Sequence, residues 1–369
     1  MALFNILHTE WSNGWGGQEI RILEECRGMR ERGHAVALAG CPRGELGRRA
    51  IQAGIPFHPL AMAGPWDLAA LSRLCRLIKE LGAQIVHTHS SVDSWLGGAA
   101  ARLCRVKCVR TRHLSVPVNK NPLNVVYRLP QAVITTGQGI RRHLVEDYGL
   151  APGRVVSIPT GVDTGRFKPA PPDIKLQGAL GLKPGEPVVA MVAVLRSWKR
   201  HDIFCQMAQM LLRQRPGLRF LIVGHGPGWQ RVNGYLDEMN LRPAVVMTGH
   251  REDIESILNL CTVCVSASDK AEGVPQSLLQ ALACERAVAA SQAGDVGEVI
   301  RPEETGLLVP AGQAEPLAQA VGRLLDDQAL RLWLGREGRR LVAAKYSREH
   351  MLKATEDLYW NVLGRGEAD

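Results

Sequence analysis

Short apolar runs alternate with longer amphipathic segments through the first half of the chain. The apolar runs are FNILHT, HAVALAG, AQIVHTH, VKCVRTRH and QAVITT. Each is about as long as a buried strand, whereas the segments between them, such as QEIRILEECRGMRERG, repeat apolar residues at the spacing of a helix face. Strands that alternate with helices predict βα units and hence a parallel sheet.

The pattern stops and then starts again in the second half. Pro and Gly accumulate in VVSIPTGVDTGRFKPAPPD, which predicts a linker around residues 164–185. Five further apolar runs follow: PVVAMVAVL, LRFLIVGHG, AVVMTG, CTVCVSAS and AVAAS. We therefore expect an α/β protein with two Rossmann-like, doubly wound parallel-sheet domains, residues 1–168 and 169–349. The helical tail 350–369 is expected to pack back on the first domain, and ligands are expected in a central cleft at the carboxyl ends of the strands.

Length and composition agree with two globular domains. A chain of 369 residues is too long for one compact core, and 46% hydrophobic with 22% charged residues is ordinary for an α/β protein. No window approaches the roughly 18 uncharged apolar residues that a membrane span needs, and the N-terminus lacks the basic lead of a signal peptide. We expect a soluble, cytoplasmic protein.

The nine cysteines lie mostly in apolar runs, which favours reduced and buried thiols. Cys261 and Cys264 have CxxC spacing, but β-branched residues surround them and no second pair supplies further metal ligands. A structural strand is therefore preferred to a zinc or redox site. Cys104 and Cys108 are interpreted in the same way.

The net charge of +9 is concentrated in the first half of the chain. Residues 1–168 hold 22 Lys and Arg against 12 Asp and Glu, whereas residues 169–369 hold 23 against 24. Residues 101–168 alone carry 12 basic and 3 acidic side chains. A positive surface there would attract a phosphorylated acceptor, an anionic membrane face or nucleic acid, and a merely solvated basic face is the alternative.

The segment AEGVPQSLLQALACERAV, residues 271–288, places a carboxylate directly before a helix. Pro275 suits the first turn of a helix, so free N–H groups are expected there, and these would hold a diphosphate. Glu272 would accept hydrogen bonds from paired sugar hydroxyls, although it would also stabilise its own helix without any ligand. Gln276 and Gln280 lie four residues apart, on one helix face.

This segment resembles the E-x7-E signature of the retaining family 4 (group 1) glycosyltransferases, whose GT-B fold has two Rossmann-like domains. Other stretches match in order along nearly the whole chain: WGGQEIRILEE, IVHTHS, VRTRH, IPTGVDTGRFKP, VAVLRSWKRHD, FLIVGHGPGW, MTGHREDI and GDVGEVIRPEETGLLVPAG. No single stretch would suffice, but eight in register indicate the family. The chain is similar to lipopolysaccharide-core and other cell-envelope glycosyltransferases.

The resemblance implies an acceptor-binding first domain and a second domain that binds a nucleotide-sugar donor. The residues it implies as catalytic are Glu272, Arg196, Lys199 and His113. The donor-binding residues are Gly16, Gly17, Thr248, Gly249, His250, Gly273, Val274, Pro275, Gln276 and Gln280. The predicted acceptor-binding residues are His89, Arg110, Arg112 and Arg128. This prediction also rests on the excess of basic residues in the region 101–168.

Each role has a physical reason and an ordinary alternative. Arg196 and Lys199 would neutralise the leaving diphosphate, and the alternative is a solvated pair at a strand end. His113 would face the reacting sugar, and the alternative is a structural histidine. Glycine at positions 16 and 17 permits close backbone approach to the diphosphate, and the alternative is a tight turn.

Three positions depart from the family pattern. The second glutamate of the signature is Gln280 here, whose amide oxygen still accepts a hydrogen bond but carries no charge. The Gly and Pro that usually follow the helix are replaced by Glu285 and Ala287, which leaves the geometry of the exit turn open. The identity of the donor is therefore not copied from relatives.

The implied reaction transfers a sugar from a UDP-, GDP- or ADP-linked donor to an acceptor hydroxyl with retention of anomeric configuration. No metal and no cofactor beyond this co-substrate are expected, since cations and helix amides would act on the diphosphate and no Asp-x-Asp pair lies in a suitable loop. The expected acceptor is an anionic glycolipid or glycan of lipopolysaccharide or other envelope synthesis. We expect peripheral contact with the inner membrane and no nucleic-acid partner.

Three other functions fit parts of the sequence. A nicotinamide-dependent oxidoreductase needs a GxGxxG fingerprint, but after Gly224 and Gly226 the third position is Trp229, because the next glycine is Gly228. A nucleotide-sugar epimerase on the same fold stays open. A basic nucleic-acid-binding protein rests on charge alone, with only 5% aromatic residues to stack on bases.

Overall fold

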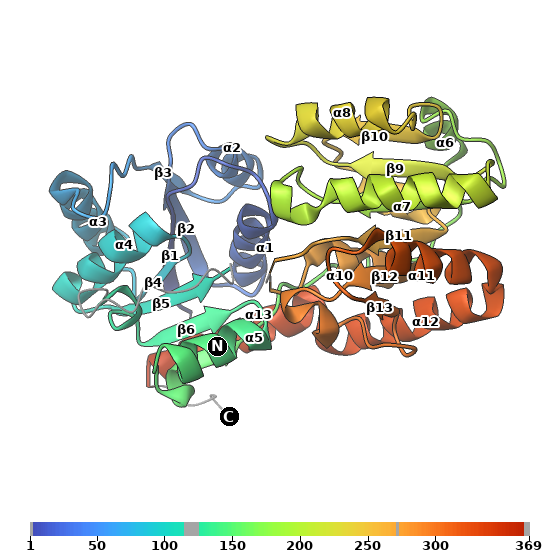
Figure 1. Cartoon of the computed structure of the whole chain (residues 1–369). Coiled ribbons are helices and arrows are strands. Elements are labelled where there is room, and N and C mark those ends of the chain that lie inside the picture. The colour runs from blue at the N-terminus through green and yellow to red at the C-terminus, as the bar shows by residue number, and fades with distance from the viewer. Residues whose placement is uncertain (1–2, 114–124, 271–272, 365–369) are drawn as a thin grey trace. The chain divides into compact units, whose positions relative to one another are not determined.

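The chain forms two compact units, each a parallel sheet with helices on both faces (Figure 1). The structure is a computed structural model that describes residues 3–113, 125–270 and 273–364. The first unit comprises residues 1–161 and 349–369, and the second comprises residues 162–348. The predicted fold class, α/β with two doubly wound parallel sheets, is confirmed. The division falls after residue 161, whereas the sequence pattern placed it after residue 168.

Seven parallel strands form the first sheet, in the order β3-β2-β1-β4-β5-β6-β7. The strands are β1 (Asn5–Glu10), β2 (Ala35–Gly40), β3 (Phe57–Pro59), β4 (Ile85–Thr88), β5 (Lys107–Arg112), β6 (Ala132–Thr135) and β7 (Val155–Ser157). The helices are α1 (Gly17–Glu31), α2 (Glu45–Gln52), α3 (Leu68–Glu80), α4 (Ser91–Cys104), α5 (Gln138–Arg142) and the C-terminal α13 (Arg348–Val362). Short turns η1 (Val125–Tyr127), η2 (His143–Asp147) and η3 (Pro152–Arg154) complete this unit.

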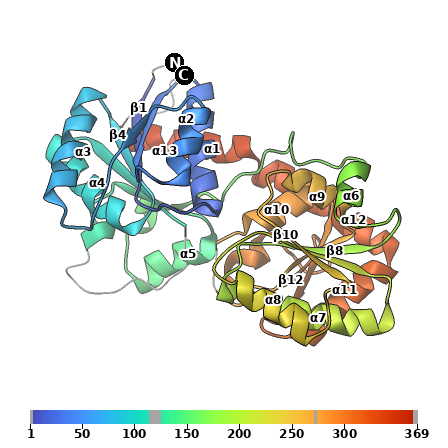
Figure 2. The ribbon, with the colours of Figure 1, turned by 90° about the horizontal axis from the view of Figure 1, so that it is seen from above.

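The helices of the first unit form two layers (Figure 2). α1, α2 and α13 cover one face of the sheet, where Met29 and Tyr359 are fully buried. α3 and α4 cover the opposite face, where Leu74 and Leu96 are buried. Apolar residues on both faces explain why the strands read as continuous apolar runs rather than as alternating ones.

The C-terminal helix α13 packs closely on α1. At Gly28 an added Cβ would lie 2.2 Å from Cδ1 of Leu352, so the two helices approach as closely as a glycine allows. Arg32 forms ion pairs with Glu349 and Glu356 of α13. The last helix of the sequence is therefore a structural part of the first unit.

Six parallel strands form the second sheet, in the order β10-β9-β8-β11-β12-β13. The strands are β8 (Val188–Val192), β9 (Arg219–Val223), β10 (Val245–Gly249), β11 (Val263–Ser266), β12 (Ala287–Ser291) and β13 (Leu307–Val309). The helices are α6 (Ile174–Ala179), α7 (His201–Gln214), α8 (Trp229–Glu238), α9 (Ile254–Leu260), α10 (Gln276–Ala283), α11 (Ala314–Asp326) and α12 (Gln328–Lys345). Short turns η4 (Ser197–Lys199) and η5 (Gly294–Glu298) follow β8 and β12.

The second unit has the same layered build. α7, α8 and α11 pack on one face, and α6, α9, α10 and α12 pack on the other (Figure 2). The prediction of a linker over residues 164–185 was wrong, because Phe167, Leu176 and Leu182 are buried in this second core. The Pro and Gly residues of this stretch form turns in a segment that packs on the second unit, and the segment is not a separate linker.

All nine cysteines lie in the described residues and none forms a disulfide. Cys261 and Cys264 are buried, Cys261 at the end of α9 and Cys264 within β11, as the structural interpretation requires. Within the described residues, every helix is too short or too polar to cross a bilayer.

Candidate functional site

Each sheet has a topological switch point, where the strand order reverses. In the first sheet the reversal lies between β1 and β4, and in the second it lies between β8 and β11. The loops that leave the carboxyl ends of such neighbouring strands go to opposite faces, and ligands of open α/β sheets bind between them. The predicted residues fall on these loops: Gly16 and Gly17 follow β1, His89 follows β4, Arg196 and Lys199 follow β8, and Gly273 follows β11.

The loop after β8 carries the two predicted cations. Arg196 is exposed and has an extended backbone, and its guanidinium carbon lies 5.1 Å from the ring centroid of Trp198. Lys199 is half-buried and ends the turn η4. The cation–π contact restricts the Arg196 side chain.

This loop is tied to the loop after β11. Arg200 has a left-handed backbone (φ 53°) and donates through Nη1 to Asp269 Oδ2 at 2.8 Å, while its other donors hold Asp202. The amide of Asp269 donates to the carbonyl of Trp198 at 3.1 Å. These bonds hold the segment that carries Arg196 beside the segment that leads to α10.

α10 begins at Gln276, with Pro275 as its N-cap residue, one position after the predicted start. Val274 and Pro275 are buried, and Val274 packs in the core of the second unit. Gln276 and Gln280 are half-buried on one face of the helix. Gly273 is buried at the approach to α10, and Glu272 lies outside the described residues.

Thr248, Gly249 and His250 end β10, on the far side of β9 from the switch point. Gly249 has φ 72°, and its carbonyl accepts from the amide of Gly224 at 2.9 Å. Thr248 is half-buried and His250 is exposed. These three residues share the carboxyl edge of the sheet with Arg196 but are separated from it by the loop after β9.

The glycines after β9 are required by packing. At Gly224 (φ 140°) an added Cβ would lie 2.0 Å from the carbonyl oxygen of Ala193, and at Gly226 and Gly228 it would lie 2.8 Å and 2.9 Å from the carbonyl oxygen of Leu195. The loop after β9 therefore lies directly against the loop after β8. This explains the glycine pattern without a dinucleotide fingerprint.

The turn after β1 leaves room at its glycines. Gly16 has an extended backbone (φ −166°) that any residue adopts, and the one atom that a Cβ would approach within 4 Å is Oε2 of Glu19 at 3.6 Å. Gly17 is exposed and begins α1. Nothing in the described chain requires glycine at Gly16, which agrees with space kept for a ligand.

Two buried carboxyl groups lie at the switch point of the first sheet. Glu10 ends β1, and its Oε1 accepts from the amide of Ser12 and from Oγ of Ser90, both at 2.6 Å. Oγ of Ser90 also lies 2.6 Å from Oδ1 of Asp93, which forms a capping box with Ser90 at the start of α4. Burial, together with the charge of Asp93, raises the pKa of Glu10 to about 8, and burial raises the pKa of Asp93.

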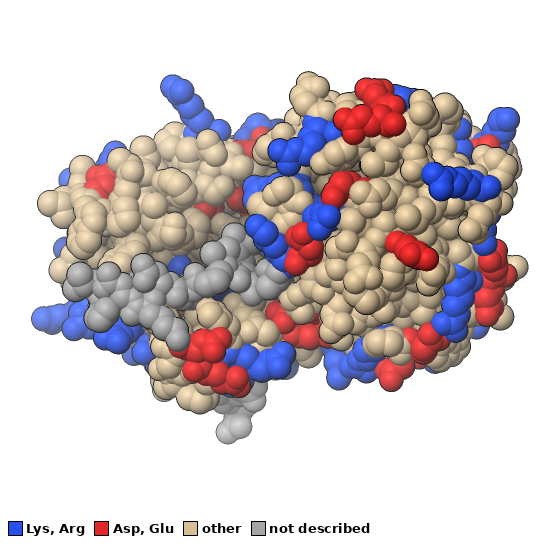
Figure 3. Space-filling model, viewed as in Figure 1, with Lys and Arg blue, Asp and Glu red and all other residues tan. Residues whose placement is uncertain are grey.

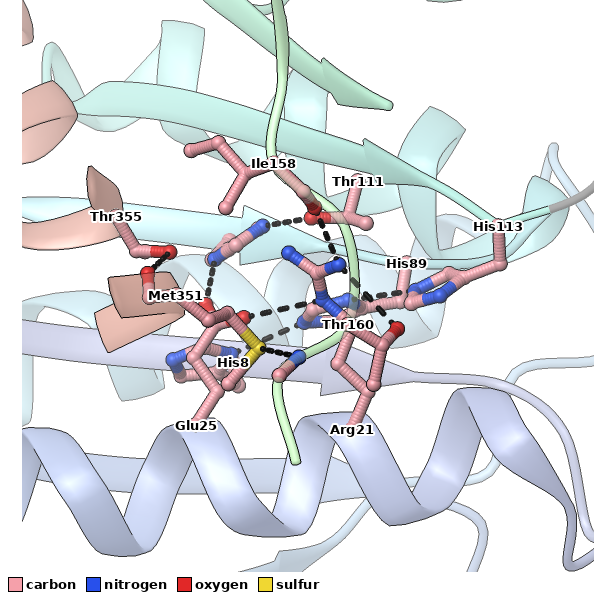
Figure 4. Close-up of polar contacts among 12 residues, drawn as sticks. His8, Arg21, Glu25, His89, Thr111, His113, Ile158, Thr160, Met351 and Thr355 are labelled. Carbon is pink, nitrogen blue, oxygen red and sulfur yellow. Dashed lines mark hydrogen bonds and ion pairs between the residues drawn. The ribbon is translucent and has the colours of Figure 1, made fainter. Parts of the chain in front are cut away.

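Four histidines come together on β1, β4 and β5. His8 and His87 are paired in register on β1 and β4. Nδ1 of His8 lies 3.0 Å from Nε2 of His89, and Nδ1 of His89 lies 3.3 Å from Nε2 of His113 (Figure 4). His89 is buried and His113 is partly exposed just after β5, so the structure joins these two predicted site residues directly.

His87 belongs to a separate buried group with Glu25 of α1. Its Nδ1 lies 2.6 Å from the hydroxyl of Tyr359 and 3.1 Å from Oε1 of Glu25, and its Nε2 lies 2.7 Å from Oγ1 of Thr111. Although burial alone would raise it, His87 and Arg21 lower the pKa of Glu25, which stays ionised in the interior.

The nitrogens of His8, His87 and His89 lie within 4.8 Å of one another, a spacing that invites comparison with a metal site. Both ring nitrogens of His87 are already bonded, and His8 and His89 are bonded to each other. A metal ion held by all three rings would have to break at least one bond of His87 and one of His89, close to the guanidinium of Arg21, which is buried beside His89. The arrangement does not suit a metal.

The three predicted acceptor-binding arginines differ in exposure. Arg110 is only 6% exposed and stacks on Tyr127, with its guanidinium carbon 4.1 Å from the ring centroid. It therefore does not belong to a positive surface, because β5 is covered on both faces and turns this side chain inward. Arg112 is half-buried and donates to the hydroxyl of Tyr127, whereas Arg128 is exposed.

A cluster of exposed positive charge in the first unit lies elsewhere. Arg102, Arg105 and Lys107 are exposed at the end of α4 and the start of β5, and they line a cavity of about 220 Å³. Lys and Arg side chains gather on the lower rim of this unit in Figure 3. Since Lys107 is the first residue of β5, this cavity lies at the amino edge of the sheet, opposite the switch point.

The sequence pattern did not single out Glu10, Arg200, Asp269 or the pair Arg21 and Glu25. The available signal was polar residues within apolar runs, such as the HTE that ends NILHTE, and the i,i+4 spacing of Arg21 and Glu25 on a predicted helix. Neither signal identifies the partner across the sheet.

Models of two known families match the two units. The model of Glycosyltransferase Family 4 matches residues 15–166, and the model of Glycosyl transferases group 1 matches residues 186–327. Together they span most of the chain.

Relatives and solved structures agree with this match. The chain is 28% identical over 313 residues, 80% of each protein, to the UDP-Gal:alpha-D-GlcNAc-diphosphoundecaprenol alpha-1,3-galactosyltransferase of Escherichia coli. It is 26% identical over 388 residues to the 2-deoxystreptamine glucosyltransferase of Streptomyces kanamyceticus, covering 94% of this chain and 99% of that protein. A glycosyltransferase from Rickettsia africae has the same fold, with a TM-score of 0.88 at 21% identity over 98% of this chain and 99% of that one. Anabaena HepE, in complex with UDP, gives 0.86 at 19% identity over 97% and 100%.

These matches favour neither an epimerase nor a nucleic-acid-binding protein. Both units carry the expected motifs in order, on the fold that the motifs implied. The chain belongs to the group 1 glycosyltransferases and is a glycosyltransferase with their two-domain α/β fold.

Proposed function

We propose that the enzyme transfers a sugar from a nucleotide diphosphate sugar to a hydroxyl of an anionic glycolipid or glycan, with retention and without a bound metal or cofactor. The observation that carries this proposal is the arrangement at the second switch point. There the bonds of Arg200 and Asp269 hold the loop of Arg196 and Lys199 beside the segment that leads to the start of α10.

The proposed site stabilises charge on a leaving diphosphate. When the bond between the anomeric carbon and the phosphate oxygen breaks, its electron pair stays on the diphosphate. Arg196, Lys199 and the first amides of α10 are fixed before the reaction and stabilise this charge as it develops. The acceptor oxygen bonds to the anomeric carbon, and its proton passes to the departing phosphate, so no side-chain base is assigned.

The names of relatives favour particular partners. The Escherichia coli relative is named for a UDP-galactose donor and a diphosphoundecaprenol-linked acceptor, and HepE was solved with UDP and with UDP-glucose. We infer that UDP-sugars are the first donors to test and that the acceptor belongs to lipopolysaccharide or another envelope glycan.

A place at the cytoplasmic face of the inner membrane is part of this proposal. Arg102, Arg105 and Lys107 at the amino edge of the first sheet suit peripheral contact with anionic lipid headgroups. Such contact would leave the carboxyl ends of the strands free for the sugar chemistry.

The donor assignment is tested by a substitution at Arg196. Arg196→Ala is expected to lower kcat about 100-fold, since it removes one charge-stabilising group. Release of nucleotide diphosphate from UDP-, GDP- and ADP-sugars, with EDTA present, measures the effect and the metal independence together. Arg231→Ala, an exposed arginine of α8, is the matched control. Equal activity of the two variants would contradict the assignment, and inverted product by NMR would contradict retention.

Glu272 and the acceptor arginines need separate tests. Glu272→Ala is expected to abolish turnover while leaving the far-UV circular dichroism spectrum unchanged; retained activity would overturn this role. Arg112→Ala with Arg128→Ala is expected to weaken transfer more than donor hydrolysis, with Arg76→Ala and Arg142→Ala, two exposed positions, combined as the charge-matched control. Equal loss of transfer and hydrolysis would count against an acceptor role.

A further inference from the structure

Three histidines form a continuous line from the middle of the first sheet to the end of β5. His8 is fully buried on β1, His89 is 3% exposed after β4, and His113 is partly exposed after β5. Figure 4 shows the line, with Nδ1 of His8 facing Nε2 of His89 and Nδ1 of His89 facing Nε2 of His113. We call these three residues the histidine relay.

The rings meet edge to edge, as hydrogen bonds between ring nitrogens require. The centroids of His8 and His89 are 5.3 Å apart with an angle of 11° between the planes, and those of His89 and His113 are 5.5 Å apart at 36°. These separations are too large for face-to-face contact, while the facing nitrogens are 3.0 Å and 3.3 Å apart. Each contact therefore has one N–H donor and one lone pair as acceptor.

The relay is neutral at physiological pH. Burial, with the neighbouring His87, lowers the pKa of His8 to about 3 against the opposing pull of Glu25. Burial also lowers the pKa of His89 and of His113. The charged or titratable groups that face the relay from the surrounding elements are Arg21, Glu25, His87, Arg110 and Asp93.

Two orders of proton placement satisfy both contacts. In the outward order His8 donates from Nδ1 to His89, and His89 donates from Nδ1 to His113. In the inward order both bonds are reversed, and His8 must then carry its proton on Nε2. Each neutral ring has one N–H only, so the choice at His8 sets the tautomer of His113.

The surroundings of His8 favour the outward order. Nε2 of His8 is buried without a hydrogen-bond partner. The outward order leaves an unpaired lone pair at this atom, whereas the inward order leaves an unpaired N–H, and buried unpaired N–H groups are the rarer of the two. The charge of Glu25 would attract an N–H, but its Oε1 is bonded to His87 and Tyr359, and its Oε2 lies 3.5 Å from Nε of Arg21.

We propose that His8 and His89 are positioning residues that hold His113 in the tautomer protonated on Nδ1, so that His113 presents an N–H donor to a ligand oxygen at the carboxyl end of β5. Nδ1 of His113 has no hydrogen-bond partner among the residues that the structure describes. The ligand atom must then be an acceptor, such as a hydroxyl or ether oxygen of a sugar. The role of His113 toward a sugar rests on the proposed function, but its tautomer does not.

The tautomer is measured directly on the unmodified enzyme. Long-range ¹H–¹⁵N NMR of the imidazole nitrogens at neutral pH distinguishes a protonated from a bare nitrogen in each ring. Protonated Nδ1 and bare Nε2 in His113, His89 and His8 are expected. Protonated Nε2 in His113, or a fast-exchanging mixture, overturns the proposal.

Two substitutions at His8 separate the relay from simple packing. His8→Phe fills the space but removes the donor, so His113 is expected to become a tautomer mixture and kcat/KM to fall about five- to tenfold, as for one lost hydrogen bond. His8→Asn keeps an N–H near the position of Nδ1 and is expected to restore both readouts. Binding of the nucleotide diphosphate is expected to stay unchanged in both variants. Equal loss in the two variants would reduce His8 to a packing role and overturn the proposal.

The outcomes separate this proposal from the proposed function. A chain with the expected tautomer that transfers no sugar overturns the function and supports the relay. A chain that transfers sugar with His113 protonated on Nε2 supports the function and overturns the relay.

Discussion

At the scale of single residues, the buried carboxyl groups of Glu10 and Asp93 share one hydroxyl, and one of the two must be protonated. Oγ of Ser90 lies 2.6 Å from an oxygen of each carboxyl group, yet a hydroxyl donates only one hydrogen. Two buried carboxylates around one hydroxyl repel each other, so one of them keeps a proton at neutral pH. The pKa of about 8 for Glu10, raised by burial and by Asp93, assigns that proton to Glu10.

This proton makes stability depend on pH in a predictable direction. The folded chain holds it up to about pH 8, whereas the unfolded chain releases it near the usual value of 4.5, so the stabilisation is complete below pH 4.5 and is lost as pH rises toward 8. The amide of Glu10→Gln is neutral at every pH and binds no titratable proton. The unfolding free energy of this variant is therefore expected to fall less steeply between about pH 5 and 8 than that of the unchanged chain. Urea unfolding at several pH values measures the slope, with exposed Glu80→Gln as control. An unchanged slope in Glu10→Gln would mean that Glu10 does not hold this proton in the folded chain.

The sequence alone could not predict the contacts between such residues, and the reason is physical. The runs containing His8 and His89 were correctly predicted as strands, but the contact between these histidines joins positions 81 residues apart. It depends on the register of β1 with β4, which hydrophobic patterning does not give. Arg196 and His113 were predicted as site residues from the family resemblance, supported by the rule that ligands of α/β sheets bind at strand ends.

At the scale of elements, the end of α10 shows how a departure from the family pattern is accommodated. Glu285 has φ 56°, its amide bonds the carbonyl of Leu282, and the amide of Arg286 bonds the carbonyl of Ala281. This is a Schellman ending with glutamate in the left-handed position that glycine normally takes. The exit turn that the sequence left open therefore keeps the usual geometry, at the cost of a strained residue.

Replacing Glu285 with glycine is expected to stabilise the fold. Glu285→Gly removes the left-handed strain and, after the entropy of glycine is subtracted, should raise the unfolding free energy by up to about 1 kcal/mol. The contact of Glu285 with Arg339 at 3.8 Å is partly exposed and contributes little. Urea unfolding of Glu285→Gly and Glu285→Ala tests this, because Ala removes the charge but keeps the strain. Equal stability of the two variants would contradict the explanation.

The strands that the sequence did not predict share one property. β3, β7 and β13 are three residues each, too short for a pattern of period two to be recognised. The ten longer strands were all marked by apolar runs. The start of α10 was predicted within one residue because Pro275 has a fixed φ that suits a helix start.

At the scale of the whole molecule, the chain passes between its units twice, after residue 161 and after residue 348. The two crossing segments pair within the second unit: the amide of Val162 bonds the carbonyl of Tyr346 at 2.9 Å, and the amide of Arg348 bonds the carbonyl of Val162 at 2.8 Å. The boundary was predicted late because Gly and Pro mark turns, and the burial of Phe167 is not visible in local composition.

This connectivity predicts that the second unit folds and binds nucleotide alone. Residues 162–348 contain both of their own cores, and their two ends are already side by side, so excision breaks no strand pairing of the second sheet. The fragment is expected to unfold cooperatively and to gain about 2.7 kcal/mol of stability at a UDP concentration 100 times its Kd. Thermal unfolding of the fragment with and without UDP measures this gain, and calorimetric titration of the fragment and of its Arg196→Ala variant measures the Kd. A folded fragment that binds no nucleotide diphosphate, when the full chain does, would place the decisive donor contacts in the first unit and contradict the site proposed at the switch point of β8 and β11.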